Sequence, residues 1–187
     1  VFLFFFSIST SPHYSDWGDD SAIFQAVGRG WAEGFLPYVD LFENKGPLIF
    51  LIDALGYMIY PRVGIFLLQI PVMYLSFLLA WRSLGIFSSG KARIAAAGFM
   101  LLQYLNCSLD GNRTEEWSMP FLMIATYFFL RGLKDEKFSC PPFVGLINGL
   151  GFGVCVVLRM LNAAPLCLCA FLSAIFLLKA GEFKVLL

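Results

Sequence analysis

The chain of 187 residues is 59% hydrophobic, 17% aromatic and only 14% charged. Soluble domains average about 45–50% apolar and about 25% charged residues, so this composition predicts an integral membrane protein. Thirteen basic and thirteen acidic residues leave no net charge, so nothing indicates a nucleic-acid partner, and the five cysteines lack the spacing of a metal or redox motif.

The chain begins in an apolar run, residues 1–6, that is too short to cross a bilayer, because a spanning helix needs roughly 20 residues. We therefore interpret the sequence as the N-terminal part of a larger membrane protein whose remainder is missing. Residues 7–62 carry many polar groups, and we expect them to form the first extracytoplasmic loop.

Within this loop, residues 20–33 predict an amphipathic helix at the membrane surface, because apolar residues recur there at helical spacing. Asp19 and Asp20 lie at the start of this helix. An aspartate before a helix is commonly an N-cap. An adjacent pair of acids on an outward-facing loop also suits a general base or a metal ligand, so both interpretations stay open.

The segment PYVDLFENKGPL, residues 37–48, combines turn-forming residues with charged and aromatic side chains. Lys45 is a point charge that could hold a lipid-linked phosphate, or a lysine that reaches toward the lipid headgroups. Tyr38 and Asp40 are further candidates for substrate binding, although Asp40 could equally be a solvated loop acid.

The apolar run 46–60 is interrupted by Gly46, Pro47, Asp53 and Gly56, so we expect it to lie along the membrane interface or to dip in and return. The predicted fold class is all-α: a polytopic transmembrane helix bundle with an amphipathic helical first extracytoplasmic loop. Five later apolar runs predict the helices of this bundle, at about 63–81, 94–107, 117–130, 142–158 and 163–178.

Basic residues crowd the linkers after the first, third and fifth of these helices, and the positive-inside rule assigns such linkers to the cytoplasm. The extracytoplasmic side then holds five basic and ten acidic residues, against eight basic and three acidic residues in the cytoplasm. If 46–60 crossed the membrane instead, the acidic clusters at 16–20 and 110–116 would fall on opposite faces. The crowded basic residues are Arg82, Lys91 and Arg93, then Arg131, Lys134 and Lys137, then Lys179 and Lys184.

The later part of the chain adds a second acidic patch and an arginine. Glu115 and Glu116 come before the run 117–130, where acids favour a helix N-terminus, but one of them could face the first acid pair across a shared cavity. Arg159 lies at the outer end of an apolar run, where it could bind phosphate or reach to the interface. A helix-packing face is predicted where glycine repeats every four residues, at Gly145, Gly149 and Gly153.

The order of these motifs resembles the GT-C class of membrane glycosyltransferases. Within that class, it is most similar to the bacterial relatives of protein O-mannosyltransferases and of the aminoarabinose transferase that modifies lipid A (glycosyltransferase family 39-like). The matching pieces are GDDSAIF, GFLPYVDLFENKGPL, GNRTEEWSMPF and LRMLN, which extend over most of residues 18–162. Each motif is loose, whereas the ordered set is fairly specific.

The resemblance implies a hexosyl- or pentosyltransferase in a multi-pass cell-membrane protein. Such enzymes take a sugar from a polyprenyl-phosphate donor outside the cytoplasm and pass it to an acceptor with inversion. By position, Asp20 or Asp19 would be the base that activates the acceptor, and Lys45 would contact the donor phosphate. Glu115 or Glu116 would complete an acidic cavity, in which Asp19, Asp20 and Glu115 are candidate ligands of a divalent metal ion. The family often has Asp-Glu where this chain has Asp-Asp, and Lys-Pro-Pro-Leu where it has Lys-Gly-Pro-Leu.

Two other classes of function stay open from the sequence. A transporter or flippase component would carry charges midway along its helices, whereas most charges here lie in linkers. A non-catalytic membrane subunit of envelope polysaccharide assembly would tolerate loss of the acid pair and of Lys45. In each case membrane lipid is an expected partner, and the residues do not identify the acceptor glycan, lipid or protein.

Overall fold

The computed structural model describes residues 5, 7–14, 18–108, 111–134 and 142–181. This part of the chain is all-helical, as predicted, and no β-strand occurs in it. Its elements are α2 (Asp19–Ala32), α3 (Pro47–Ile59), α4 (Val63–Phe87), α5 (Gly90–Ser108), α6 (Thr114–Lys134), α7 (Pro142–Leu158), the short 3-10 helix η1 (Met160–Ala163) and α8 (Ala164–Ala180).

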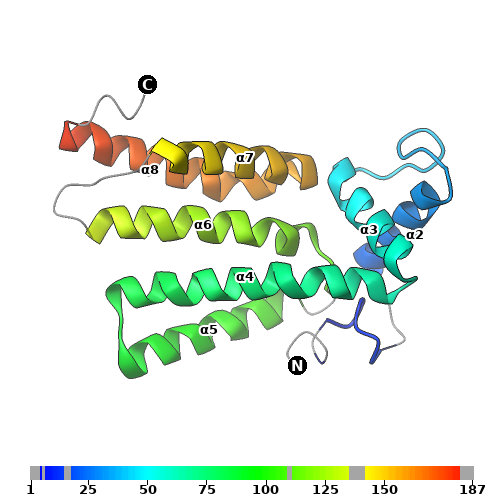
Figure 1. The fold of residues 1–187 in the computed structure, drawn as a ribbon, viewed down its shortest axis with the longest axis horizontal. Helices are drawn as coiled ribbons and strands as arrows, with labels where there is room; N and C mark the ends of the chain where they lie inside the picture. The colour runs from blue at the N-terminus through cyan, green and yellow to red at the C-terminus, as the bar shows by residue number, and fades with distance from the viewer. Residues whose placement is uncertain (1–4, 6, 15–17, 109–110, 135–141, 182–187) are drawn as a thin grey trace.

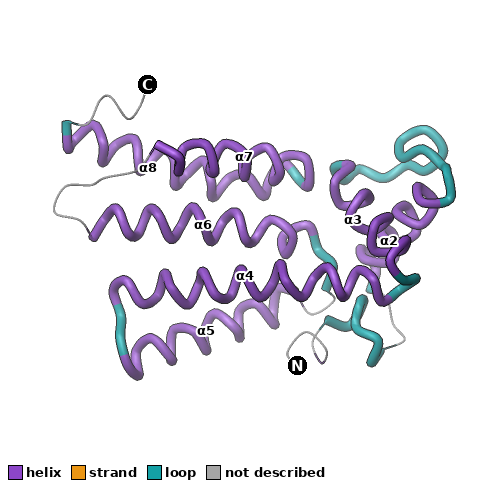
Figure 2. The backbone as a smooth tube through the Cα atoms, viewed as in Figure 1, coloured by secondary structure: helices purple, strands orange, loops and turns teal. Residues whose placement is uncertain are grey.

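The helices α4 to α8 lie side by side, and the chain runs back and forth between the two ends of this bundle (Figure 1). The helices α2 and α3 pack on each other at one end of the bundle, where α4 and α6 begin and α7 ends (Figures 1 and 2). The helix α3 does not run alongside α4 (Figure 1). Residues 47–59 are therefore not one of the helices that lie side by side in the bundle.

Residues of restricted or unusual backbone conformation mark where several helices begin and end. Pro47 occupies the first turn of α3, where its missing N–H would have no partner within the helix. Arg62 has a φ of 74° and is the N-cap of α4, so the chain turns sharply there from α3 into the bundle. Gly181 ends α8 in the left-handed conformation that glycine adopts without steric cost.

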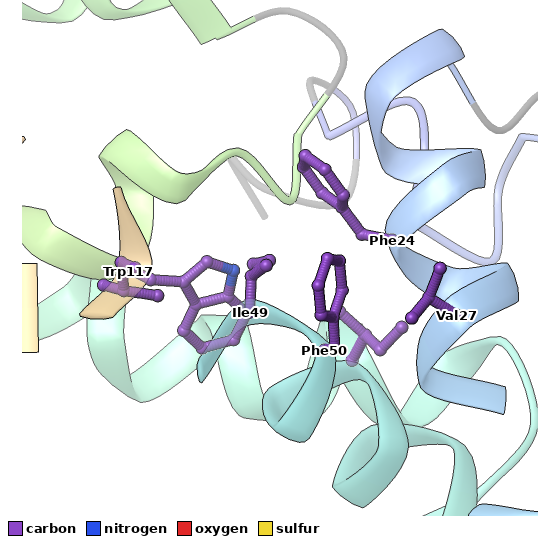
Figure 3. Close-up of a cluster of buried hydrophobic side chains, with 7 residues drawn as sticks. Phe24, Val27, Ile49, Phe50 and Trp117 are labelled. Atoms are coloured by element: carbon purple, nitrogen blue, oxygen red, sulfur yellow. The ribbon is translucent and has the colours of Figure 1, made fainter. Parts of the chain in front are cut away.

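The largest cluster of buried apolar side chains joins α2 and α3 to the end of the bundle (Figure 3). Phe24 and Val27 come from α2, Ile49 and Phe50 from α3, and Trp117 from α6, and all five are nearly inaccessible. Burying a large apolar side chain stabilises a fold by about 1.5–3 kcal/mol. This cluster therefore holds the two end helices in a fixed position on the bundle.

The outer surface of the bundle is apolar over much of its length. Two segments, Val63–Phe87 and Met160–Lys179, are long and apolar enough to cross a membrane. Length and composition thus identify two candidate spans in the described chain, where the sequence predicts five. Exposed large side chains on the bundle helices include Leu67, Tyr74, Phe99, Leu146 and Phe171.

The prediction that the glycine repeat of α7 forms a packing face is wrong for the described residues. A Cβ added to Gly145, Gly149 or Gly153 would meet no atom within 4 Å, so this face of α7 is open. The helix packs on α6 through Gly151 instead, where an added Cβ would lie 3.1 Å from the Cβ of Phe121. The four-residue repeat gives the spacing of a face but does not specify which neighbour covers it.

Candidate functional site

The described charged residues form two groups at opposite ends of the bundle. Segments 18–62 and 111–116, which contain all of the described acids, meet with Arg159 at the end that carries α2 and α3 (Figure 1). The remaining described basic residues lie toward the opposite end. This separation matches the one that the sequence predicts for two sides of a membrane. Seven residues that the prediction also uses lie outside the described residues: Asp16, Asp110, Lys137, Lys184 and the three acids of the cytoplasmic count, Asp135, Glu136 and Glu182.

Lys45 and Arg159 line one pocket at the acidic end, although 113 positions separate them in the chain. The pocket has a volume of about 470 Å³. Its two cations come from the loop before α3 and from the turn between α7 and η1. The complete lining is Asn44, Lys45, Gly46, Val156, Arg159, Met160 and Leu161.

The loop that carries Lys45 is held against the end of α7 by Gly46. The backbone N–H of Gly46 donates to the carbonyl of Leu158 over 3.2 Å, and a Cβ on Gly46 would lie only 1.8 Å from the carbonyl oxygen of Val157. Only a glycine allows this approach. A proline at this position would also lack the N–H that donates here.

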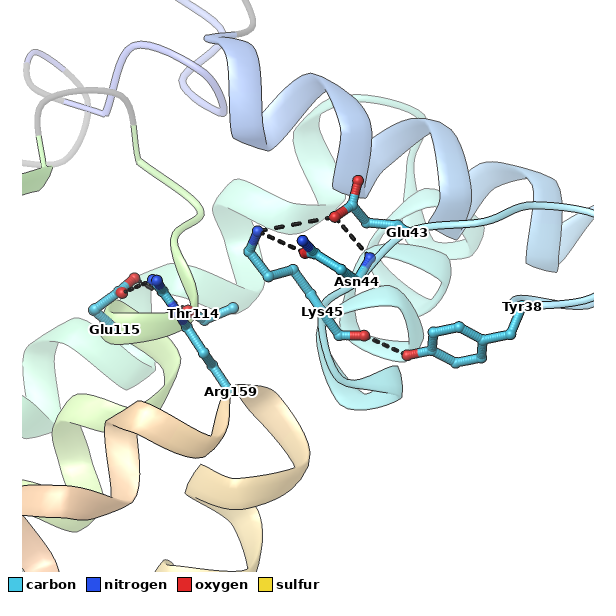
Figure 4. A network of polar contacts seen from close by, with 7 residues as sticks. All are labelled: Tyr38, Glu43, Asn44, Lys45, Thr114, Glu115 and Arg159. Atoms are coloured by element: carbon cyan, nitrogen blue, oxygen red, sulfur yellow. Dashed lines mark hydrogen bonds and ion pairs between the residues drawn. The ribbon is translucent and has the colours of Figure 1, made fainter.

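The side chain of Lys45 is directed by its own loop (Figure 4). Its Nζ donates to Asn44 Oδ1 over 3.0 Å and lies 3.8 Å from Glu43 Oε1. The hydroxyl of Tyr38 donates to the backbone carbonyl of Lys45, so Tyr38 supports the backbone of the loop. The structure therefore gives Tyr38 a positioning role beside Lys45, rather than a place in the lining of this pocket.

Arg159 lies between α7 and η1 and has an extended backbone conformation, with a φ of −165°. Its Nη1 lies 2.6 Å from Glu115 Oε1, and the side chains are 41% and 50% exposed (Figure 4). An exposed pair of this kind contributes only about 0–1 kcal/mol, so an anion could compete for Arg159. Met160 and Leu161, 79% and 69% exposed, add an apolar edge beside the two cations.

A second, larger cavity of about 950 Å³ opens between α2 and α3. Arg29 and Glu33 form an ion pair of 2.7 Å on its wall, and the hydrogen bond from Arg29 lowers the pKa of Glu33. Asp40 also lines the cavity, and its Oδ2 accepts a 2.8 Å hydrogen bond from the N–H of Leu36. Asp40 therefore stabilises its own turn as well as contributing negative charge to the cavity.

Asp53 is the buried acid of this cavity, and its side chain is inaccessible to solvent. Its Oδ1 accepts a 2.8 Å hydrogen bond from Asn112 Nδ2, while its Oδ2 has no partner among the described residues. Burial raises the pKa of Asp53 well above its usual range, because desolvation disfavours the charged form. The close packing of α2 depends on Gly28, where an added Cβ would lie 2.4 Å from the Cβ of Asp53.

Asp53 was predicted only to interrupt the apolar run 46–60 and was not predicted as a site residue. An acid within an apolar run is itself a signal for function, since a buried charge is costly. The structure adds the hydrogen-bond partner of Asp53, which is Asn112. Asn112 connects Asp53 to α6, because its Oδ1 accepts a 2.9 Å hydrogen bond from Trp117 Nε1.

Glu115 and Glu116, predicted together as one acidic patch, point in different directions. Glu115 is at the surface with Arg159, whereas Glu116 is 1% exposed. The hydroxyl of Tyr104 donates to Glu116 Oε1 over 2.7 Å, and Gln69 Nε2 donates to its Oε2. Glu116 therefore belongs to a buried network that joins α4, α5 and α6, and only Glu115 lies beside the pocket cations.

Asp19 and Asp20 are exposed in the first turn of α2 and line neither cavity. The N-cap is Gly18, with no side-chain cap, so the N-cap interpretation of the acid pair is wrong. Among the described residues, no three His, Cys, Asp or Glu side chains gather in a way that could hold a metal ion. Asp19, Asp20 and Glu115, the candidate ligands of a divalent metal ion, are therefore not gathered together in this arrangement.

Comparisons of the chain with protein-family models, with curated proteins and with solved structures found no match.

Proposed function

We propose that this chain forms part of a membrane glycosyltransferase that takes a sugar from a polyprenyl-phosphate donor at the extracytoplasmic face of the cell membrane. The observation that carries the proposal is the pocket shared by Lys45 and Arg159. Two cations with an apolar edge of Met160 and Leu161 match a ligand that joins a phosphate to a hydrocarbon chain. A lipid-linked sugar phosphate has this combination.

The distribution of charge supports the membrane orientation. The basic residues at the end of the bundle opposite α2 and α3 suit the cytoplasmic side. The acidic end, with the Lys45–Arg159 pocket, then lies outside the cytoplasm. In this orientation α2 and α3 rest at the membrane surface, and the hydrocarbon of a donor lipid can follow the apolar side of α7 and α8.

The reaction requires the bond between the anomeric carbon and the phosphate oxygen to break while an acceptor hydroxyl forms a new bond to that carbon. The departing polyprenyl phosphate carries the negative charge that develops, and Lys45 and Arg159 would stabilise it. The acceptor proton passes to a carboxylate. Asp20 or Asp19 is the proposed base, since both residues are exposed in the first turn of α2, a helix at the end of the bundle that holds the pocket.

Binding of the donor lipid tests the pocket directly. The chain is purified in nanodiscs and titrated with radiolabelled polyprenyl phosphate and with polyprenol of the same length. Polyprenyl phosphate should bind more tightly than polyprenol, and Lys45→Gln or Arg159→Gln should weaken binding of the phosphate roughly tenfold each, which is about 1.4 kcal/mol. Arg29→Gln is the matched control, because Arg29 is also an exposed arginine paired with a glutamate but lies outside this pocket. Equal binding of the two lipids by the unaltered chain would overturn the donor assignment.

Transfer is tested separately, with a radiolabelled hexose linked to polyprenyl phosphate and the protein in its native membranes. Asp19→Asn or Asp20→Asn should abolish sugar transfer while leaving polyprenyl phosphate binding unchanged. If both single variants transfer at the wild-type rate, neither acid is the base. A non-catalytic assembly subunit would bind the lipid and show no transfer in any form.

A further inference from the structure

The end of the bundle opposite the Lys45–Arg159 pocket contains another cavity that the proposed function does not use. It has a volume of about 470 Å³ and lies between the end of α4, the start of α5 and the end of α6. Four cations and one tyrosine contribute to its wall. The complete lining is Arg82, Gly85, Ile86, Arg93, Tyr127, Arg131 and Lys134.

Arg93 is held in a defined position in this cavity. Its Cζ lies 3.8 Å from the centre of the Trp81 ring, and its Nε and Nη2 donate to the carbonyl of Trp81 over 3.1 and 2.6 Å. The guanidinium also lies flat against Gly85, where an added Cβ would be 2.7 Å from Arg93 Cζ. The absence of a side chain at position 85 is what lets Arg93 sit at this place.

The other three cations of the cavity have no hydrogen bond or ion pair to any described residue: Arg82, Arg131 and Lys134. Like charges from three helices therefore converge on one cavity without a described acid to balance them. The cations repel one another, and a bound anion would offset this repulsion. Arginine is especially suited to phosphate, whose oxygens match the fork of the guanidinium.

From this arrangement we infer that the cavity binds the phosphate group of an anionic phospholipid headgroup. Phe87 and Ile94, which follow the lining residues Ile86 and Arg93 in the chain, have exposed apolar side chains that would lie against the acyl chains of such a lipid. Lipid binding in this cavity is independent of sugar transfer. General attraction of the basic linkers to a negative membrane is a different effect, because it depends on total charge and not on the position of Arg93.

Gly85→Ala separates these two effects without changing charge. Alanine is favourable in a helix, and its Cβ displaces only the flexible end of Arg93, so α4 should remain intact. The purified chain in neutral detergent is titrated with phosphatidylglycerol, with phosphatidylcholine and with inorganic phosphate, and bound lipid is counted by native mass spectrometry. We expect one tightly bound phosphatidylglycerol, no bound phosphatidylcholine and only weak competition by inorganic phosphate.

Gly85→Ala and Arg131→Gln should each weaken phosphatidylglycerol binding roughly fivefold or more. Lys179→Gln is the matched control for charge, since Lys179 lies near the same end of the bundle but outside the cavity. Its affinity should equal that of the unaltered chain. If Gly85→Ala binds as tightly as the unaltered chain, or Lys179→Gln is weakened as much as Arg131→Gln, the binding is general attraction and the inference is wrong. Occupation by inorganic phosphate with no retention of phosphatidylglycerol would overturn the lipid as the source of the phosphate.

Discussion

Replacing Gly46 by alanine should both destabilise the protein and weaken donor binding, because Gly46 holds the Lys45 loop on the end of α7. Its φ of −68° and ψ of 156° are accessible to any residue, so alanine brings no backbone strain of its own. The added Cβ would instead lie 1.8 Å from the carbonyl oxygen of Val157 and 3.0 Å from that of Leu158. The effect of the substitution is therefore purely steric.

The magnitude follows from the displacement that the clash requires. The Cβ and the Val157 oxygen must separate by about 1.6 Å to reach an ordinary contact of 3.4 Å. That movement breaks the 3.2 Å hydrogen bond from Gly46 to Leu158, which contributes about 0.5–1.5 kcal/mol, and overpacking adds about 1–3 kcal/mol. We expect the free energy of unfolding to fall by about 1.5–4.5 kcal/mol and the affinity for polyprenyl phosphate to fall with the displacement of Lys45.

The assay is thermal unfolding of the purified chain in detergent, followed by titration with polyprenyl phosphate below the unfolding temperature. Gly153→Ala is the matched control, because a Cβ at Gly153 would meet nothing within 4 Å and alanine favours the helix α7. The control should unfold at or slightly above the wild-type temperature. A Gly46→Ala variant that unfolds with the wild type and binds the lipid equally well would refute the close contact between this loop and α7.

Three further predictions test the acidic end and the orientation of the bundle. The pKa of Asp53 is 3.8 in the unfolded chain and is raised in the folded state, so between these two values the folded protein holds a proton that the unfolded chain releases. The free energy of unfolding therefore falls as pH rises through this range. Asp53→Asn removes that loss, and its unfolding temperature relative to the wild type should climb with pH; parallel curves would contradict the raised pKa. Glu115→Gln removes the competitor for Arg159 and should tighten polyprenyl phosphate binding roughly two- to fivefold, whereas weaker binding would mean that Glu115 positions Arg159. Single cysteines at Val39 and Ser89, both exposed, should react with impermeant reagents from opposite sides of the membrane, and labelling from one side would refute the bundle orientation.

The secondary structure and the separation of charge could be predicted from the sequence because both depend on short stretches of chain. Apolar runs bounded by glycine, proline and charged residues locate the helices, and α7 begins and ends at the limits of the predicted run 142–158. Other helices extend beyond their runs, as α4 does from residue 81 to Phe87, because polar residues such as Arg82 continue a helix at its end. The basic linkers likewise identify one end of the bundle without knowledge of any contact.

The composition of the site was decided only by the tertiary structure. Lys45 and Arg159 share a pocket because Gly46 docks on the end of α7, and no local pattern encodes that contact. Adjacent side chains on a helix point about 100° apart, so the side chains of Glu115 and Glu116 must point in different directions. Which of the two is buried depends on the packing of α4 and α5 on α6, where Gln69 and Tyr104 contact Glu116.

Local chemistry therefore determined which segments are helical and which end of the bundle is acidic. The burial of Asp53 and Glu116, the exposure of Asp19 and Asp20, and the open glycine face of α7 depend on which surfaces meet. Burial is a property of pairs of surfaces brought together from distant parts of the chain, and a one-dimensional pattern does not specify the partner of each surface.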